Sequence, residues 1–180
     1  MRFLRWLCSR FKRTPKIKKS PFKMTFDSRT EKNLATLDPE VQDEMRKFVA
    51  LAKKVAARFG MTFKVISGMR TAEEQQRLWN IGRKTPGKIV TKAKPWTSSH
   101  NYGTAIDGAL FEGDVYLDGK DSKLSTKIYK VIANNAEADG LKIEAGVHWK
   151  SFPDPPHFEY ITGRSMAEMK QRMQKGQSVV

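Results

Sequence analysis

Two stretches of the chain carry residue types that can hold a metal ion. One contains His100 and Asp107, seven residues apart, and the other contains His157, fifty residues further on. Asp154 lies three residues before His157 and adds a second carboxylate. Catalytic zinc sites take three nitrogen or oxygen ligands from the protein and leave a fourth position open for water. The two stretches therefore indicate a zinc peptidase, provided that the fold brings them to one point.

Each of these residues also has a purely structural explanation. His100 can occupy a turn, Asp107 can cap an element or lie at the surface, and His157 falls in an apolar stretch where a lone histidine is usually structural. The chain has only three histidines, and two of them lie in these stretches. The third, His148, is a rival ligand or a substrate contact. It is the combination of residues that favours the metal site.

Asp154 is the candidate general base. Water bound to zinc has its pKa lowered to about 7, and a positioned carboxylate can take its proton and pass it to the leaving amine. Pro155 and Pro156 would hold Asp154 stiffly relative to His157. Without the metal site, Asp154 would be a solvent-exposed residue in a proline-rich loop.

Two further side chains can support such a site. Arg70 follows a Ser-Gly turn, where a guanidinium can stabilise an oxyanion or a substrate carboxylate, although most arginines in turns are simply solvated. Glu159 points to the opposite side of its expected strand from Phe158 and can orient a ligand imidazole. The aspartates at 114, 118 and 121 lack the spacing of a calcium-binding loop and indicate an acidic turn.

The composition fits one folded domain with a strongly basic tail. The net charge of the 180 residues is +15, and residues 1–23 hold nine Lys or Arg and no acid, so the rest carries 25 basic and 19 acidic residues. This charge points to anionic partners. No nucleic-acid-binding motif is present in residues 24–180, so we expect no nucleic acid partner. We therefore predict a tail and linker over 1–23 and a single zinc peptidase domain over 24–180.

The tail has a pattern of its own. Residues 1–13 place apolar side chains on one helical face and basic ones opposite, which predicts a short amphipathic helix for an anionic membrane or envelope surface. The alternative is a solubilising tail. Arg5 interrupts the apolar start, so a conventional signal peptide fits poorly, and no apolar run reaches transmembrane length. Cys8 is the only cysteine, which excludes an intramolecular disulfide and a Cys-rich zinc site.

The remaining sequence alternates helical and strand patterns. Asp38-Pro39 starts a helix that ends at Gly60, Thr71 and Glu74 form a capping box, and a second capping box begins at Ser165. Short strands mixed with helices predict an α+β fold with a small antiparallel sheet. The expected helices cover 38–60, 71–81, 125–140 and the residues after 165; the expected strands cover 61–66, 104–111, 141–145 and 157–161, with a hairpin turn at 118–119 and a long surface loop over 83–97.

Three motifs in this order resemble a known family. They are Ser-Gly-x-Arg-Thr over 67–71, Ser-x-His-x-x-Gly-x-Ala-x-Asp over 98–107, and Asp-x-x-His-Phe-Glu over 154–159. This set resembles the zinc D-Ala-D-Ala carboxypeptidase and dipeptidase superfamily. The fuller strings Ser-His-Asn-Tyr-Gly and Trp-Lys-Ser-Phe-x-Asp-x-Pro-His-Phe-Glu are similar to its L-alanyl-D-glutamate endopeptidase branch, which includes phage endolysins and bacterial wall hydrolases. The resemblance covers roughly residues 26–165.

The resemblance implies a role for each matched residue. It implies a small α+β fold like that of the Hedgehog signalling domain, and a substrate carbonyl stabilised by Arg70. His148 stands where relatives often have Asp before Trp149, which can alter substrate contacts. The implied zinc ligands are His100, Asp107 and His157, the implied base and acid is Asp154, and the expected supporting or substrate-contacting residues are Ser98, Glu159, His148 and Trp149.

We therefore expect a zinc-dependent monomer that hydrolyses the L-Ala–D-Glu bond of peptidoglycan stem peptides. A D-Ala-D-Ala carboxypeptidase or dipeptidase is the nearest alternative, and a non-catalytic basic binding module is the other. The expected place of action is the bacterial cell wall, reached with the help of a separate membrane-permeabilising protein.

Overall fold

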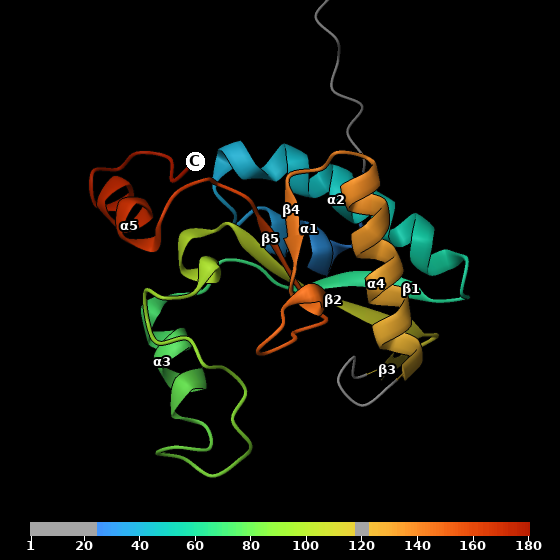
Figure 1. The fold of residues 1–180 in the computed structure, drawn as a ribbon, viewed down its shortest axis with the longest axis horizontal. Coiled ribbons are helices and arrows are strands. Elements are labelled where there is room, and N and C mark those ends of the chain that lie inside the picture. The colour runs from blue at the N-terminus through green and yellow to red at the C-terminus, as the bar shows by residue number, and fades with distance from the viewer. Residues whose placement is uncertain (1–24, 118–122) are drawn as a thin grey trace, which may run out of the picture.

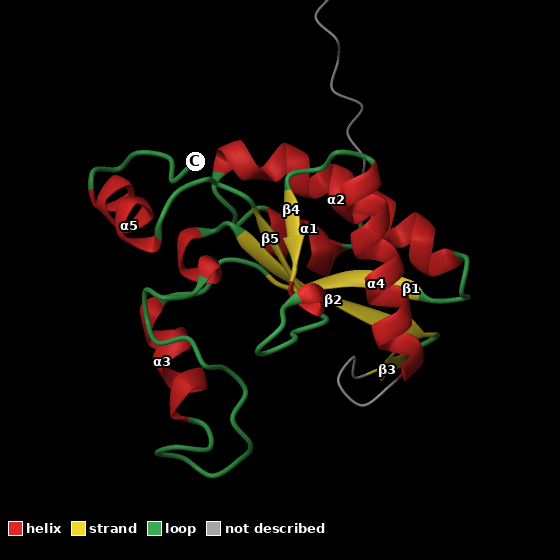
Figure 2. Cartoon of the chain, viewed as in Figure 1, coloured by secondary structure: helices red, strands yellow, loops and turns green. Residues whose placement is uncertain are grey.

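The computed structural model describes residues 25–117 and 123–180. The amphipathic helix, the linker and the hairpin turn expected at 118–119 lie outside these residues. Among the described residues, no helix is both long and apolar enough to cross a membrane. The described residues form five α-helices and one antiparallel sheet (Figures 1 and 2), which confirms the α+β prediction.

The sheet is built around one long strand. Its members are β1 (Thr62–Ser67), β2 (Ala105–Glu112), β3 (Val115–Leu117), β4 (Ile143–Ala145) and β5 (His157–Tyr160), in the order β1-β2-β5-β4. The first part of β2 pairs with β5 and its last part pairs with β3, while β1 runs along most of its other edge. The chain therefore places two segments that are distant in sequence, β2 and β5, side by side.

Two helices, α2 (Pro39–Ala57) and α4 (Lys123–Ala138), cover one side of the sheet (Figure 1). Helix α1 (Ser28–Leu34) contacts β1. The smaller helices α3 (Ala72–Asn80) and α5 (Met166–Gln174) lie apart from this layer (Figure 1).

The predicted helix starts follow from local hydrogen bonds. The Asp38 carboxylate accepts a hydrogen bond from the backbone N–H of Glu40 at the start of α2, and the next residue is a proline. Thr71 and Glu74 form the predicted capping box of α3, as do Ser165 and Glu168 at α5. These starts are confirmed because each depends only on residues within one turn.

Several elements were not predicted, among them α1, β3 and a 3-10 helix. Helix α1 is capped at its start by Asp27, whose carboxylate accepts hydrogen bonds from Thr30. The turn between β2 and β3 falls at 113–114, where Gly113 has a φ of 58°. A 3-10 helix, η1 (Ser99–Tyr102), carries His100 and ends at Gly103, whose φ is 65°. Short segments of this kind carry too little periodicity to be recognised in the sequence.

A cluster of aromatic rings fixes the sheet against its helices. The ring of Phe48 on α2 lies 4.6 Å from that of Phe158 on β5 and 6.3 Å from that of Phe63 on β1, measured between centroids. Tyr129 on α4 lies 6.2 Å from Phe158 and donates its hydroxyl to the Gly108 carbonyl of β2. All these rings are fully buried. Strands β2 and β5 are therefore both anchored on their helix-covered face.

The alternation of side chains along a strand then determines which residues point to the face of the sheet away from α2 and α4. Successive residues of a strand point to opposite faces of the sheet. Ile106 on β2 and Phe158 on β5 belong to the core beneath the helices. Their neighbours Asp107 and His157 consequently point to the opposite face, and the register places these two residues directly across from each other.

The C-terminal segment supports η1. Tyr102, Met169 and Val179 form a second small core cluster, which joins η1 to α5 and to the end of the chain. The Asp38 carboxylate, besides capping α2, accepts a hydrogen bond from the backbone N–H of Val179 at 3.0 Å. The 3-10 helix η1, which carries His100, is therefore packed against both α5 and the C-terminal segment.

Candidate metal centre

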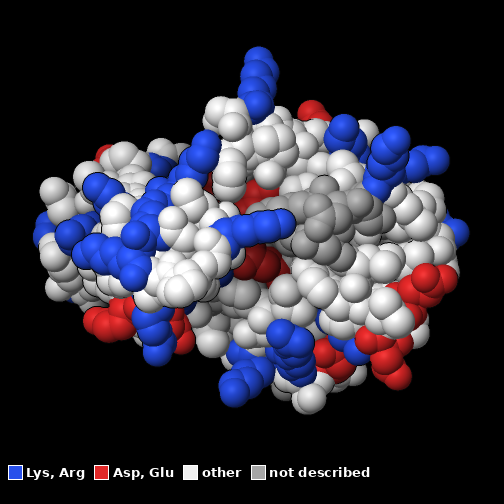
Figure 3. Space-filling view, turned by 90° about the horizontal axis from the view of Figure 1, so that it is seen from below, with Lys and Arg blue, Asp and Glu red and all other residues white. Residues whose placement is uncertain are grey.

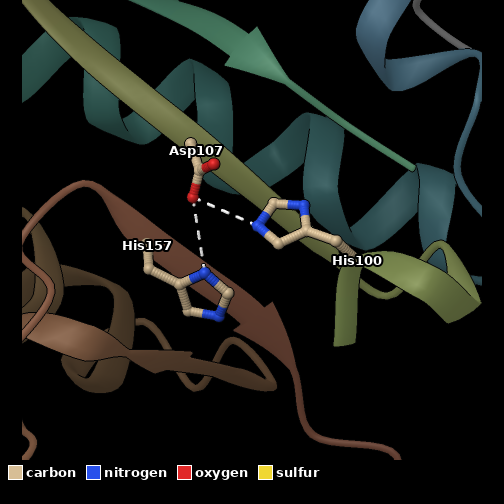
Figure 4. Close-up of side chains that lie close together, drawn as sticks. All are labelled: His100, Asp107 and His157. Carbon is tan, nitrogen blue, oxygen red and sulfur yellow. Dashed lines mark hydrogen bonds and ion pairs between the residues drawn. The ribbon is translucent and has the colours of Figure 1, made fainter. Parts of the chain in front are cut away.

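His100, Asp107 and His157 meet at one point on the face of the sheet away from α2 and α4 (Figure 4). One ligand atom from each lies within 4.8 Å of the others. Nε2 of His100 is 3.1 Å from Oδ1 of Asp107, and Nδ1 of His157 is 3.4 Å from the same oxygen. Three donors converging on a point of this size can coordinate one metal ion.

Outer hydrogen bonds decide which nitrogen of each imidazole is available. Nδ1 of His100 lies 2.7 Å from the Gly68 carbonyl, which can only accept, so this nitrogen carries the proton and Nε2 is left for the metal. Nε2 of His157 lies 3.0 Å from a carboxylate oxygen of Glu159, so Nδ1 is left instead. The two histidines would therefore present different nitrogens to a metal ion, and each is oriented by a fixed acceptor.

Gly68 can supply its carbonyl because it has no side chain. A Cβ built there would lie 2.4 Å from both the Asn33 carbonyl oxygen and the Thr36 hydroxyl. The turn before Arg70 is thus held tightly against the end of α1, and the acceptor for His100 is held with it. The glycine of the Ser-Gly turn is therefore needed for the close packing that positions the acceptor for His100.

The charges of the site depend strongly on one another. Burial alone would raise the pKa of Asp107, but the imidazoles of His100 and His157 hold it well below its usual value. Burial would lower the pKa of His157, but hydrogen bonds to Asp107 and Glu159 raise it to about 9. Burial would likewise raise the pKa of Glu159, and its hydrogen bonds with His157 and Ser99 lower it. A metal ion would replace the proton that His157 shares with Asp107.

The donor set fits zinc. Two imidazole nitrogens and one carboxylate oxygen match the three protein ligands of a catalytic zinc ion, whereas calcium and magnesium prefer oxygen donors alone. Each ligand has a partner outside the metal sphere: Gly68 for His100, Glu159 for His157, and Arg70 for Asp107. Such partners are the usual companions of zinc ligands in proteins.

The guanidinium of Arg70 is held in place by hydrogen bonds to side chains in and around the site. Its Nη2 lies 3.1 Å from Oδ2 of Asp107 and 3.2 Å from the Ser67 hydroxyl, and its Nη1 lies 2.9 Å from Oε1 of Gln75. The sequence suggested a contact with substrate, and the structure adds a contact with the ligand carboxylate. Gln75, which is completely buried, was missed by the sequence analysis because a glutamine inside a helix carries no signal of its own.

Asp154 lies beside the ligands on the turn that leads into β5. Its backbone N–H donates to the Gly146 carbonyl at 2.9 Å, and its own carbonyl accepts from the backbone N–H of His157 at 3.0 Å. A Cβ at Gly146 would come within 2.5 Å of the Asp154 carbonyl oxygen. The turn therefore packs directly on Gly146, which sets where the Asp154 carboxylate stands relative to His157.

These residues line a cleft of about 560 Å³. Ser98, Arg70 and Asp154 are among its lining residues, and so is Trp149, whose ring lies 4.9 Å from that of His157. His148 is exposed and is not part of this lining. Seen from below (Figure 3), acidic side chains lie at the bottom of a hollow, with many Lys and Arg side chains on the lobe to its left.

Glu159 offers a test of this arrangement. Changing Glu159 to Gln removes the negative charge that holds His157 while keeping the side chain's shape, and we expect zinc affinity to fall by roughly 10- to 100-fold. Competition with a chromogenic chelator would measure the change. Glu137→Gln, at an exposed position of α4 that does not line the cleft, is the matched control. Equal affinity in both variants would contradict the role given to Glu159.

The fold and the site together define a class of protein: a small α+β domain with one candidate metal centre, whose ligands come from two neighbouring strands and a 3-10 helix. Comparison with known proteins shows which families and structures this chain is similar to. A family model described as D-alanyl-D-alanine carboxypeptidase matches residues 91–160. The matched segment contains the three converging residues, His100, Asp107 and His157, and also Asp154.

One curated relative is the peptidoglycan L-alanyl-D-glutamate endopeptidase CwlK of Bacillus subtilis (strain 168). It is 37% identical over 115 residues, a match that covers 61% of this chain and 66% of the relative, slightly under two thirds of its length.

Two solved structures share the fold. The L-Ala D-Glu endopeptidase ChiX of Serratia marcescens has a TM-score of 0.50 at 22% identity, covering 79% of this chain and 93% of that one. The LD-carboxypeptidase LdcB has a TM-score of 0.51 at 17% identity, covering 88% and 71%. At these identities the likeness concerns the fold.

Proposed function

We propose that the protein is a zinc-dependent peptidoglycan endopeptidase that hydrolyses the L-Ala–D-Glu bond of stem peptides. The observation that carries this proposal is the convergence of His100, Asp107 and His157 in a cleft that also contains Asp154. The relative CwlK, named for this bond, supports the choice of substrate. By the same argument we propose that the protein acts on the bacterial cell wall.

The geometry of the site supports a proposed role for each of these residues. Zinc held by the three ligands would supply a Lewis acid for the scissile carbonyl and a water of lowered pKa. Asp154 takes a proton from the attacking water and delivers it to the nitrogen of the leaving amine, so that the carbon–nitrogen bond breaks without expelling an amide anion. Arg70 keeps Asp107 in place and adds positive charge beside the substrate carbonyl.

A second candidate activity, that of a D-Ala-D-Ala carboxypeptidase, is supported by the match to the family model. A D-Ala-D-Ala carboxypeptidase would use the same zinc site and the same base, but it would release the terminal D-Ala of the stem peptide. Identifying the products of a purified muropeptide separates the two activities. A peptide that begins with D-Glu supports the endopeptidase, and free D-Ala supports the carboxypeptidase. A protein that binds muropeptides without producing either would be a binding module.

We also propose that residues 1–23 bring the enzyme to anionic envelope surfaces. The support for this is their charge, nine bases and no acid, and the apolar face of residues 1–13. Deleting residues 1–23 is expected to weaken sedimentation with anionic lipid vesicles and to reduce its dependence on salt. Neutral vesicles serve as the control. Equal sedimentation of both forms with anionic vesicles would contradict this role.

A further inference from the structure

The loop between α3 and η1 forms one wall of the cleft. Residues 83–97 contain five Lys or Arg and no acid. Part of this loop, Val90 to Ala93, lines the cleft together with the metal ligands. In Figure 3, Lys and Arg side chains gather on the lobe beside the hollow that holds the acidic groups. The mechanism above uses none of these cations.

The part of the loop around Lys92 is held in place. The buried amide of Gln75 donates to the Ala93 carbonyl at 2.8 Å, and Nη2 of Arg83 donates to the Thr91 carbonyl at 3.0 Å. The backbone N–H of Ala93 also donates to the Thr91 hydroxyl at 3.2 Å. Residues on both sides of Lys92 are therefore fixed, and Gln75 joins this segment to Arg70.

The side chain of Lys92 reaches the opposite wall of the cleft. Its ammonium nitrogen lies 4.5 Å from the centre of the Phe152 ring, and Phe152 is two residues before Asp154. Among the described residues, no carboxylate lies within ion-pair distance of Lys92. The ammonium therefore stands at the cleft with a positive charge that these residues leave uncompensated, and the Phe152 ring steadies its position.

The other charges of the cleft make this cation important for an acidic substrate. Among the described lining residues, three carry carboxylates, Asp107, Asp154 and Glu159, and each negative charge lowers the affinity of the cleft for a carboxylate on the substrate. The Lys and Arg residues among them are Arg70 and Lys92, and Arg70 is already paired with Asp107. Within this described part of the lining, Lys92 is thus the basic side chain that can meet a substrate carboxylate.

We propose that Lys92 binds the free α-carboxylate of the D-Glu residue that follows the scissile bond. In stem peptides D-Glu continues through its side-chain carboxyl group, so its main-chain carboxylate remains free on the carbon next to the scissile nitrogen. This inference rests on the proposed function. It makes Lys92 a specificity-determining residue that distinguishes stem peptides carrying D-Glu from those in which this carboxylate is amidated.

A pair of synthetic substrates tests the inference. N-acetyl-L-Ala-γ-D-Glu-L-Lys and its analogue with an α-carboxamide on D-Glu differ only in the charge that Lys92 is proposed to bind. For a solvent-accessible ion pair we expect the full-length zinc enzyme to prefer the carboxylate by about two- to fivefold in kcat/KM, mainly through KM. The preference is expected to shrink as salt is added.

Three variants isolate the charge. Lys92→Met keeps the apolar stem against Phe152 and should lose the preference, whereas Lys92→Arg keeps the charge and should retain it. Lys88→Met removes a charge from the same loop at an exposed position outside the cleft lining, and should also retain it. The ratio between the two substrates is measured within each variant, so a general loss of activity does not mimic the effect.

The possible outcomes separate the two proposals. If the enzyme cleaves both peptides after L-Ala with the same efficiency, or if Lys92→Met retains the wild-type preference, the inference is wrong and the endopeptidase function stands. If the enzyme cleaves neither peptide after L-Ala, the proposed function is wrong and the role of Lys92 is wrong with it. A preference that disappears only in Lys92→Met supports both.

Discussion

Replacing Asp154 with Asn is expected to lower kcat on muropeptides by roughly 10²- to 10⁴-fold, the usual contribution of a positioned general base and acid. The amide has nearly the same shape as the carboxylate, and Asp154 is not among the three converging donors, so zinc content should stay near one ion per chain. The turn itself should persist, because its contacts with Gly146 and His157 are made by backbone atoms. Single-turnover cleavage together with metal analysis would measure both effects.

The control for this prediction is Asp139→Asn. Asp139 is exposed after the end of α4 and does not line the cleft. It should leave kcat and zinc content unchanged. Full turnover in Asp154→Asn would remove Asp154 from the mechanism, and loss of zinc in that variant would show that it acts as a ligand instead.

Removing zinc is expected to abolish cleavage and to lower thermal stability. The ligands are preformed by the sheet register and by η1, so the metal-free protein should remain folded and regain activity on addition of one equivalent of zinc. Ligand binding to the folded state alone stabilises it, by about 4 kcal/mol when free zinc is a thousand times its dissociation constant. Activity and the unfolding midpoint, followed against added zinc, would show both changes.

Two histidine variants sharpen this experiment. His157→Ala removes a converging ligand and should neither bind zinc tightly nor recover activity when zinc is added. His148→Ala removes the histidine that the sequence left as a rival ligand, and its exposed position outside the cleft lining predicts normal zinc binding. Zinc loss in His148→Ala with retention in His157→Ala would reverse the assignment.

The local parts of the fold could be predicted because they depend on neighbours in sequence. Asp38 with Pro39 starts α2, and Thr71 with Glu74 caps α3, through contacts that span a few residues. Helix α1 and the 3-10 helix η1 are too short for a periodic pattern. The turn of the β2–β3 hairpin lies at 113–114, in a stretch where several Gly and Asp residues offered competing turn positions.

The candidate site was visible in the sequence as residue types, and its geometry was not. That Asp107 stands opposite His157 follows from the pairing of β2 with β5, a contact between strands fifty residues apart that no local pattern specifies. The nitrogen that His100 presents depends on Gly68, which only the folded chain brings to it, whereas Glu159 lies two residues from His157 and could be proposed as its partner from the sequence. Gln75 and Lys92 also gained their roles through tertiary contacts.

Digestion of purified muropeptides with zinc-loaded and zinc-stripped protein, followed by mass spectrometry, tests the central claim most directly. The zinc-loaded protein should release a peptide whose amino-terminal residue is D-Glu and leave L-Ala on the muramic acid, and the stripped protein should release nothing until zinc is returned. Release of D-Ala alone, or equal digestion with and without zinc, would contradict the assignment as a zinc-dependent L-alanyl-D-glutamate endopeptidase.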